Sequence, residues 1–71
     1  MSHGKGYILI GSKIRGARNK IRISQQKLAD SIDISKGRLG RIERGEVSPT
    51  VDELRIIAAA LNVNLSDLLV K

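Results

Sequence analysis

Four cationic side chains follow one another at short intervals in the middle of the chain, and their types and spacing are suited to binding an anion. They are Lys36, Arg38, Arg41 and Arg44. A guanidinium can donate paired hydrogen bonds to a phosphate or to a guanine edge, whereas an ammonium binds as a point charge. Positions three or four apart share one face of an α-helix, so this spacing predicts a helix rich in cations.

Two serines divide the surrounding segment into two short helices. Ser24 and Ser35 are N-cap candidates, and each is flanked by a pair of apolar residues in the positions of a hydrophobic staple, Ile23 with Leu28 and Ile34 with Leu39. The first helix is expected to reach about residue 32, and the second to end at Gly45, which suits a left-handed C-cap. A short helix, a tight turn and a second, basic helix form a helix-turn-helix, which places its second helix in the major groove of DNA.

The residues of the basic helix can be assigned by angle. If Leu39 and Ile42 face inward, the outward positions are Gly37, Gly40, Arg41 and Arg44, with Lys36 at the leading end. Arg41 is then best placed to reach a base edge, and Lys36 could contact a base or a phosphate. Arg38 and Arg44 are expected to bind phosphate.

The two glycines of the basic helix have two interpretations. Gly37 and Gly40 would let the helix backbone approach the bases closely, although each weakens a helix by about 1 kcal/mol relative to alanine. The alternative is that both glycines are neutral changes on a helix held by packing.

Two further sites come from the helix that precedes the turn and from the first helix. Gln25 follows the Ser24 cap at the positive end of its helix, where a phosphate oxygen is well accommodated, although a solvated side chain is an equal alternative. Arg18 adjoins an apolar stripe and needs a partner there, for which Glu43 is the candidate. The alternative for this pair is two solvated charges.

The remaining sequence predicts the scaffold. An amphipathic helix is expected over residues 8–21, after a flexible N-terminus of residues 1–7. Thr50 and Glu53 form a capping box that opens another helix, and Asn64 opens a last helix that reaches the C-terminus. The predicted inner positions of these helices are Ile10, Ile14, Ala17, Ile21, Leu54, Ile57, Ala58, Leu61 and Leu68. The fold class expected is all-α, a single compact domain of five helices over residues 8–71.

Composition limits the function. The chain has 71 residues, a net charge of +6, 41% hydrophobic residues and no cysteine. The charge favours a polyanionic partner, with a merely soluble basic surface as the alternative. No membrane partner is expected, because no helix pattern sets a cationic face against a bulky aromatic or leucine-rich face. Tyr7 is the only aromatic residue, which disfavours single-stranded nucleic acid. With no nucleophile-and-base set, phosphate loop or metal-ligand cluster, we expect no enzyme activity, metal, cofactor or small-molecule ligand.

The stretch from Ile10 to Leu69 resembles the lambda-repressor/Cro-like helix-turn-helix family, which includes phage repressors, restriction–modification controller proteins and antitoxins. The segments that carry the resemblance are IGSKIRGAR, ISQQKLADSI, ISKGRLGRIERG and SPTVDELRIIAAALNVNLSDLL. The resemblance implies that the basic helix reads the major groove and that Gln25 holds a phosphate. It places the base-contacting positions on Lys36, Gly37 and Arg41, and the buried ion pair of the family on Arg18 and Glu43.

The chain departs from this family where glycine often follows a helix. Those places hold Arg22, Asp33 and Asn62. Aspartate and asparagine tolerate a left-handed conformation, whereas Arg22 should be mildly strained. Gly37 also lacks the side chain that commonly reads a base at its position.

The sequence therefore predicts a sequence-specific regulator of transcription, of repressor or controller type, that binds double-stranded DNA. We expect it to be cytoplasmic and DNA-associated, and to be encoded by a bacterium or a phage. We expect a homodimer on a pseudo-palindromic operator, because one helix-turn-helix reads only a few base pairs. The dimer interface is assigned to Ile56, Leu65, Leu69 and Val70, although Leu65 and Leu69 could instead face the core. The alternatives are an antitoxin that binds both DNA and a toxin, or a protein-interaction module without DNA binding.

Overall fold

The computed structural model describes the backbone of residues 3–69 and the side chains of residues 9–69. Within these residues the chain forms helices and no strand, so the predicted all-α class is confirmed. The helices are α1 (His3–Lys20), α2 (Gln25–Ser31), α3 (Lys36–Glu43), α4 (Val51–Leu61) and α5 (Leu65–Leu68). Among residues 3–69, no helix combines the length and apolar character needed to cross a membrane.

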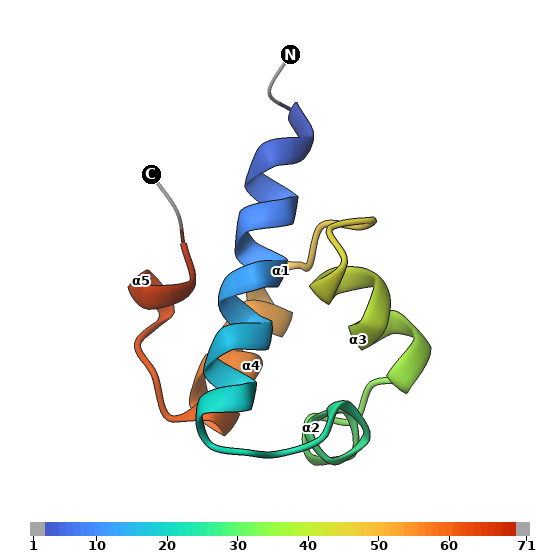
Figure 1. Ribbon diagram of the computed structural model, residues 1–71, viewed down its shortest axis with the longest axis vertical. Helices are drawn as coiled ribbons and strands as arrows, with labels where there is room; N and C mark the ends of the chain where they lie inside the picture. Colours follow the sequence, from blue (N-terminus) through green and yellow to red (C-terminus); the bar gives the residue numbers. More distant parts are fainter. Residues whose placement is uncertain (1–2, 70–71) are drawn as a thin grey trace.

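Helix α1 runs through the middle of the molecule and organises the others (Figure 1). It contacts α3, α4 and α5, while α2 contacts α3 and α4. In Figure 1, α2 and α3 lie on one side of α1 and α5 lies on the other. The helix-turn-helix formed by α2 and α3 is therefore supported from one side by α1.

The helix starts follow the predicted caps. The Ser24 hydroxyl accepts a hydrogen bond from the amide of Lys27 at 3.0 Å, and the Ser35 hydroxyl accepts one from Arg38 at 3.0 Å. Thr50 and Glu53 form the predicted capping box at the start of α4. These bonds satisfy amide groups that the first turn of a helix leaves without partners. The serines thus set where the two helices of the helix-turn-helix begin.

The two ends of the chain differ from the prediction. Helix α1 begins at His3 rather than at residue 8, because the glycines near its start lower helix propensity without breaking the hydrogen-bond ladder as a proline would. Helix α5 ends at Leu68 instead of reaching the C-terminus, since Leu69 has an extended backbone. Helix α1 thus covers most of the segment that was expected to be a flexible terminus.

An aliphatic core joins all five helices within the described residues. Its buried members are Ile14, Leu28, Ala29, Ile32, Leu39, Ile42, Leu54, Ile57, Ala58, Leu61 and Leu68. The predicted inner positions are confirmed except for Ile21, which is 46% exposed. Helix α1 ends at Lys20, so Ile21 is in the turn and no longer follows the helical period.

Three corners of the fold are made by residues other than glycine in the left-handed conformation. Arg22, Asp33 and Asn62 each have φ of 60°, and Gly45, after α3, has φ of 77°. These are the positions at which the sequence predicted such corners. Arg22 has no side-chain preference for this conformation, so it is the strained member of the three.

Gly11 sets how closely α1 and α3 approach. A Cβ atom at position 11 would lie 2.5 Å from the carbonyl oxygen of Glu43 and closer still to that of Ile42. The backbone of α1 therefore touches the end of α3 directly. Gly16, by contrast, has no atom of another part of the described chain within 4 Å of where its Cβ would be.

We expect Gly11→Ala and Gly16→Ala to have opposite effects on stability. At position 16 alanine should raise the free energy of unfolding by about 1 kcal/mol, because it favours the helix. At position 11 the overlap with two backbone carbonyls should lower it by about 1–3 kcal/mol, which outweighs the same helical gain. Chemical denaturation of both variants measures this difference, and equal effects would show that the two helices do not meet at Gly11.

Candidate nucleic-acid interface

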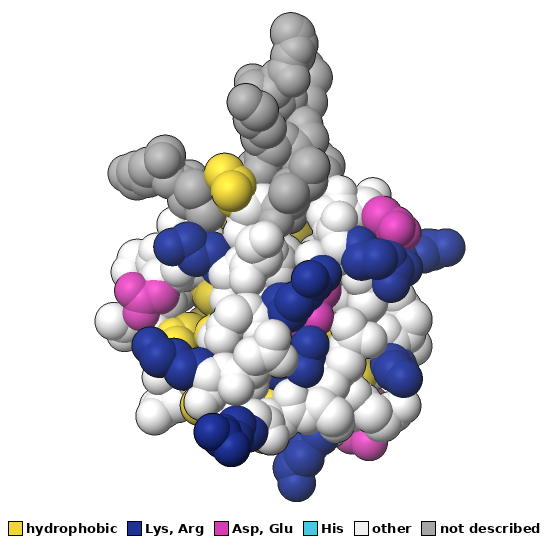
Figure 2. Space-filling model, in the orientation of Figure 1, with side chains coloured by type: hydrophobic (Ala, Val, Ile, Leu, Met, Phe, Trp, Pro, Cys, Tyr) yellow, Lys and Arg dark blue, Asp and Glu magenta, His cyan; other side chains and the backbone are white. Residues whose placement is uncertain are grey.

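The outer face of α3 presents cationic side chains to solvent. Lys36, Gly37, Arg41 and Arg44 are exposed, whereas Leu39 and Ile42 are buried, as the helical period predicted. Within the described residues neither Lys36 nor Arg41 forms an ion pair. Figure 2 shows Lys and Arg side chains spread over the face that includes α1 and α3, with fewer acidic ones. Lys36 and Arg41 are therefore available to an external anion.

Gly40 does not occupy the outward position that the sequence assigned to it. It is buried, and a Cβ at this position would lie 3.5 Å from the side-chain oxygen Oε1 of Gln25 and 3.1 Å from Nη1 of Arg44. The first residue of α2 thus covers this part of α3. Gly40 makes room for the Gln25 side chain, and only Gly37 leaves the backbone of α3 open to solvent.

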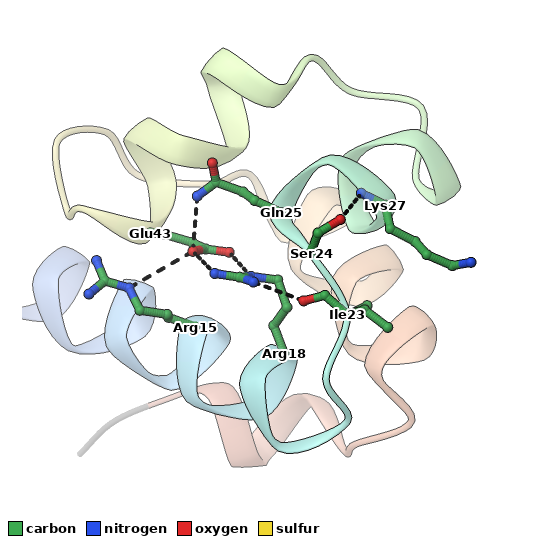
Figure 3. A network of polar contacts seen from close by, with 7 residues as sticks. All are labelled: Arg15, Arg18, Ile23, Ser24, Gln25, Lys27 and Glu43. Carbon is green, nitrogen blue, oxygen red and sulfur yellow. Dashed lines mark hydrogen bonds and ion pairs between the residues drawn. The ribbon is translucent and has the colours of Figure 1, made fainter.

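A buried carboxylate lies behind this face (Figure 3). Glu43 is 3% exposed, and Arg18 contacts both of its oxygens, at 2.9 Å through Nε and at 3.0 Å through Nη2. Arg18 also donates to the carbonyl oxygen of Ile23 at 2.9 Å. The structure therefore contains the ion pair that the sequence predicted, and this pair joins α1, the turn after it, and α3.

Two further side chains complete the surroundings of Glu43. The Gln25 amide donates to Glu43 Oε1 at 3.1 Å, and Arg15 Nε lies 3.9 Å from the same oxygen. The sequence missed both contacts, because nothing in local spacing relates residues 15, 25 and 43. Gln25, assigned to phosphate, is in this structure a hydrogen-bond donor to a buried carboxylate, and Figure 3 shows its carbonyl oxygen directed away from Glu43.

Arg38, which the sequence assigned to phosphate, is instead engaged with α4. Its guanidinium donates to Glu53 at 2.7 Å through Nε and at 2.8 Å through Nη2. Glu53 also accepts the amide of Thr50 at 2.8 Å. Hydrogen bonding from Arg38 holds the pKa of the Glu53 carboxyl down at about 2, so the pair stays ionised near neutral pH. Arg38 lies beside the inward stripe of α3 and therefore connects α3 to α4.

Arg44 also has an acidic neighbour, but this pair lies in solvent. Its Nε is 2.8 Å from Glu46 Oε2, and both side chains are more than half exposed. Hydrogen bonding from Arg44 lowers the pKa of the Glu46 carboxyl. Exposed pairs of this kind are weak and are screened by salt, so a phosphate can compete for Arg44.

Comparison with known proteins agrees with this geometry. A family model described as helix-turn-helix matches residues 14–68. The chain belongs to this helix-turn-helix family. The resemblance seen in the sequence is therefore confirmed, and the matched range includes the α2–α3 unit and the ion pair of Arg18 with Glu43.

Relatives within the family differ in length. The helix-turn-helix chain is 38% identical over 63 residues to the control protein C.BamHI of Bacillus amyloliquefaciens, covering 87% of this chain and 78% of that protein. It is 30% identical over 57 residues to the immunity repressor protein of Bacillus phage phi105, where it covers 80% of this chain but only 40% of the repressor. It thus spans less than half of the repressor's length.

The fold is shared with a solved controller protein. The crystal structure of the restriction-modification controller protein C.AhdI from Aeromonas hydrophila superimposes with a TM-score of 0.89 at 24% identity, covering 96% of this chain and 99% of that one. At 24% identity this likeness establishes the five-helix fold only. The side-chain contacts described above are observed in the present chain and are not taken from C.AhdI.

We expect Glu43→Ala to destabilise the protein much more than Glu46→Ala. Removal of Glu43 leaves Arg18 without its counter-charge in a largely buried place, which costs about 3–5 kcal/mol. Glu46 pairs with Arg44 in solvent, so its removal should change the melting temperature little. Thermal melts at one protein concentration compare the two variants, and equally small shifts would show that the Glu43 network contributes little to stability.

Proposed function

We propose that this helix-turn-helix protein is a sequence-specific regulator of transcription, of repressor or controller type, that binds double-stranded DNA with α3 in the major groove. The observation that carries the proposal is that Lys36 and Arg41 on the outer face of α3 are exposed and form no ion pair with any residue that the structure describes. The relatives reported above are a control protein and a phage repressor, which favours a regulator over an antitoxin. The role is binding, with no catalytic step.

The residues have separate tasks in this proposal. Arg41 reads a base edge through its guanidinium, and Lys36 contacts a base or a phosphate. Arg44 binds a phosphate, which replaces its solvent-exposed ion pair with Glu46. Gln25 can donate the second hydrogen of its side-chain amide to a phosphate oxygen while the first stays bonded to Glu43, so the buried network fixes its position. Arg38 contributes by holding α3 against α4, because its guanidinium is hydrogen-bonded to Glu53.

Arg41→Ala should remove discrimination at one base pair and leave non-specific binding nearly intact. One bidentate contact supplies about 1–3 kcal/mol of discrimination. Gln25→Ala should instead weaken all duplexes by similar factors, since it acts on the backbone of DNA and on the position of α3. Arg55→Ala, an exposed arginine on α4, is the matched control and should change neither property.

The measurement begins with selection of bound sequences from a random duplex pool. Affinities of the three variants are then compared on matched and mismatched duplexes at several salt concentrations. Wild-type binding should fall with a log–log slope of roughly −0.9 for each phosphate neutralised. Absence of duplex binding, or the same profile for the Arg41 and Gln25 variants, would refute the assignment.

We further propose a homodimer that binds a pseudo-palindromic operator. Ile56 on α4 is 47% exposed and Leu69 after α5 is 45% exposed, and both are apolar. Leu65, also assigned to the interface, is half-buried against the core and can contribute only its outer part. Val70 lies outside the described residues. Two-fold pairing would place two α3 helices about 34–36 Å apart, one turn of DNA.

A charge at the proposed interface should produce a folded monomer. Ile56→Glu or Leu69→Glu should lower the mass in sedimentation and weaken binding to the full operator more than binding to a half-site. Val51→Glu is the matched control, because Val51 is also apolar and exposed but is not assigned to the interface. A wild-type monomer at high concentration that binds half-sites as tightly as full sites would exclude the dimer.

A further inference from the structure

A groove between α1 and α5 lies outside the proposed DNA-binding face, since no residue of α3 lines it. It is an open hollow of about 680 Å³, bounded by α1 on one wall and by α5 and the segment before it on the other. Its apolar lining consists of Leu9, Ala17, Ile21, Leu61, Val63 and Leu68. In Figure 1, α3 and α5 lie on opposite sides of α1, and Figure 2 shows hydrophobic atoms between Lys and Arg side chains on the α5 side.

Large apolar side chains are exposed to solvent in the lining of the groove. Leu9 and Ile21 belong to its lining and are among the large apolar side chains that remain exposed. Scattered apolar residues are ordinary on a protein surface, but here they extend a hollow whose floor is the edge of the core. A ligand that filled the groove would remove both side chains from water.

The charges along the groove are unequal. Lys13 and Lys20 line the α1 wall, and neither forms an ion pair with any described residue. They are seven positions apart in a helix, about 10 Å along its axis. Asp67, on the α5 wall, already accepts a hydrogen bond from the amide of Asn64 at 3.1 Å. The α1 wall therefore has two unneutralised cations beside an apolar floor.

Gly16 lies between the two lysines and leaves that wall open. Among the residues that the structure describes, no atom outside α1 lies within 4 Å of where its Cβ would be, so another backbone can approach α1 closely at this point. A bulky residue here would fill the groove without disturbing the core. The same position thus provides a test that leaves the fold intact.

We propose that this groove binds an amphipathic helix from a partner protein, with its apolar face on the floor and its acidic side chains beside Lys13 and Lys20. A helix in an apolar groove is a common mode of peptide recognition, and acidic residues seven positions apart on the partner would match the spacing of the lysines. A second copy of this chain fits less well, because the residues assigned to its interface, Ile56, Leu65 and Leu69, do not line the groove. Since the groove is on the other side of α1 from α3, the partner and DNA can bind together.

The test uses two synthetic helical peptides of 18 residues. Each has leucines along one face, and each has two flanking positions seven residues apart that are glutamate in one peptide and lysine in the other. Binding to isotopically labelled protein is followed by amide chemical shifts and by fluorescence anisotropy. The glutamate peptide should shift amides of α1 and α5, and it should bind about tenfold more tightly than the lysine peptide.

Two groove variants make the test specific. Gly16→Leu should reduce binding of the glutamate peptide at least about tenfold, by the loss of one well-filled apolar contact surface. The double variant Lys13→Glu with Lys20→Glu retains the backbone and should reverse the preference between the peptides. Lys27→Glu on α2 is the matched control and should leave peptide binding unchanged. Operator affinity of the Gly16 variant, measured separately, should stay at the wild-type value.

Three outcomes would overturn the proposal. The first is equal affinity for the two peptides, or no binding of either. The second is a set of shifted amides on α3 rather than on α1 and α5. The third is a lower sedimentation mass for Gly16→Leu than for the wild type, which would show that a second copy of the chain occupies the groove. None of these results depends on whether the protein binds DNA, so failure here is distinct from failure of the proposed function.

Discussion

The neutralisation of one buried carboxylate determines how the helices of this protein meet. Glu43, at the last turn of α3, is removed from water and is compensated by the bidentate Arg18 and by the Gln25 amide. A charge in such a place is tolerated only with excellent geometry and complete hydrogen bonding. Arg18 comes from α1 and Gln25 from α2, so the requirement fixes the position of three helices at once. The direct contact of Gly11 with the carbonyls of Ile42 and Glu43 brings α1 close enough for Arg18 to reach.

The same network lies directly behind the face that is proposed to contact DNA. Gln25 is bonded inward to Glu43 and covers Gly40, so its orientation relative to Arg41 and Arg44 follows from the core rather than from solvent. On the other flank, Arg38 and Glu53 connect α3 to the capped end of α4. Both ends of α3 are thereby held by charged pairs, while its outer face stays free. Preorganisation of this kind reduces the ordering that binding would otherwise require.

Local features could be predicted from the sequence, whereas most contacts across space could not. The serine caps, the capping box at Thr50 and the left-handed corners depend on residues a few positions apart, and the structure has them where they were expected. The pair of Arg18 and Glu43 was found because each charge adjoins an apolar stripe. The contact of Arg38 with Glu53 was missed, because the spacing of a cation on a basic helix is the same whether the side chain faces DNA or a neighbouring glutamate. Gly11 gave no signal at all, since its role exists only where two helices cross.

The left-handed corners at Arg22, Asp33 and Asn62 also affect the state from which the protein folds. A glycine at each corner would fold without strain, but it would give the unfolded chain many more backbone conformations to lose. Residues with a Cβ have fewer backbone conformations in the unfolded chain, although they are somewhat strained in the folded protein. The stability of this small domain is therefore set partly by the entropy of its unfolded chain, at positions that lie outside the core.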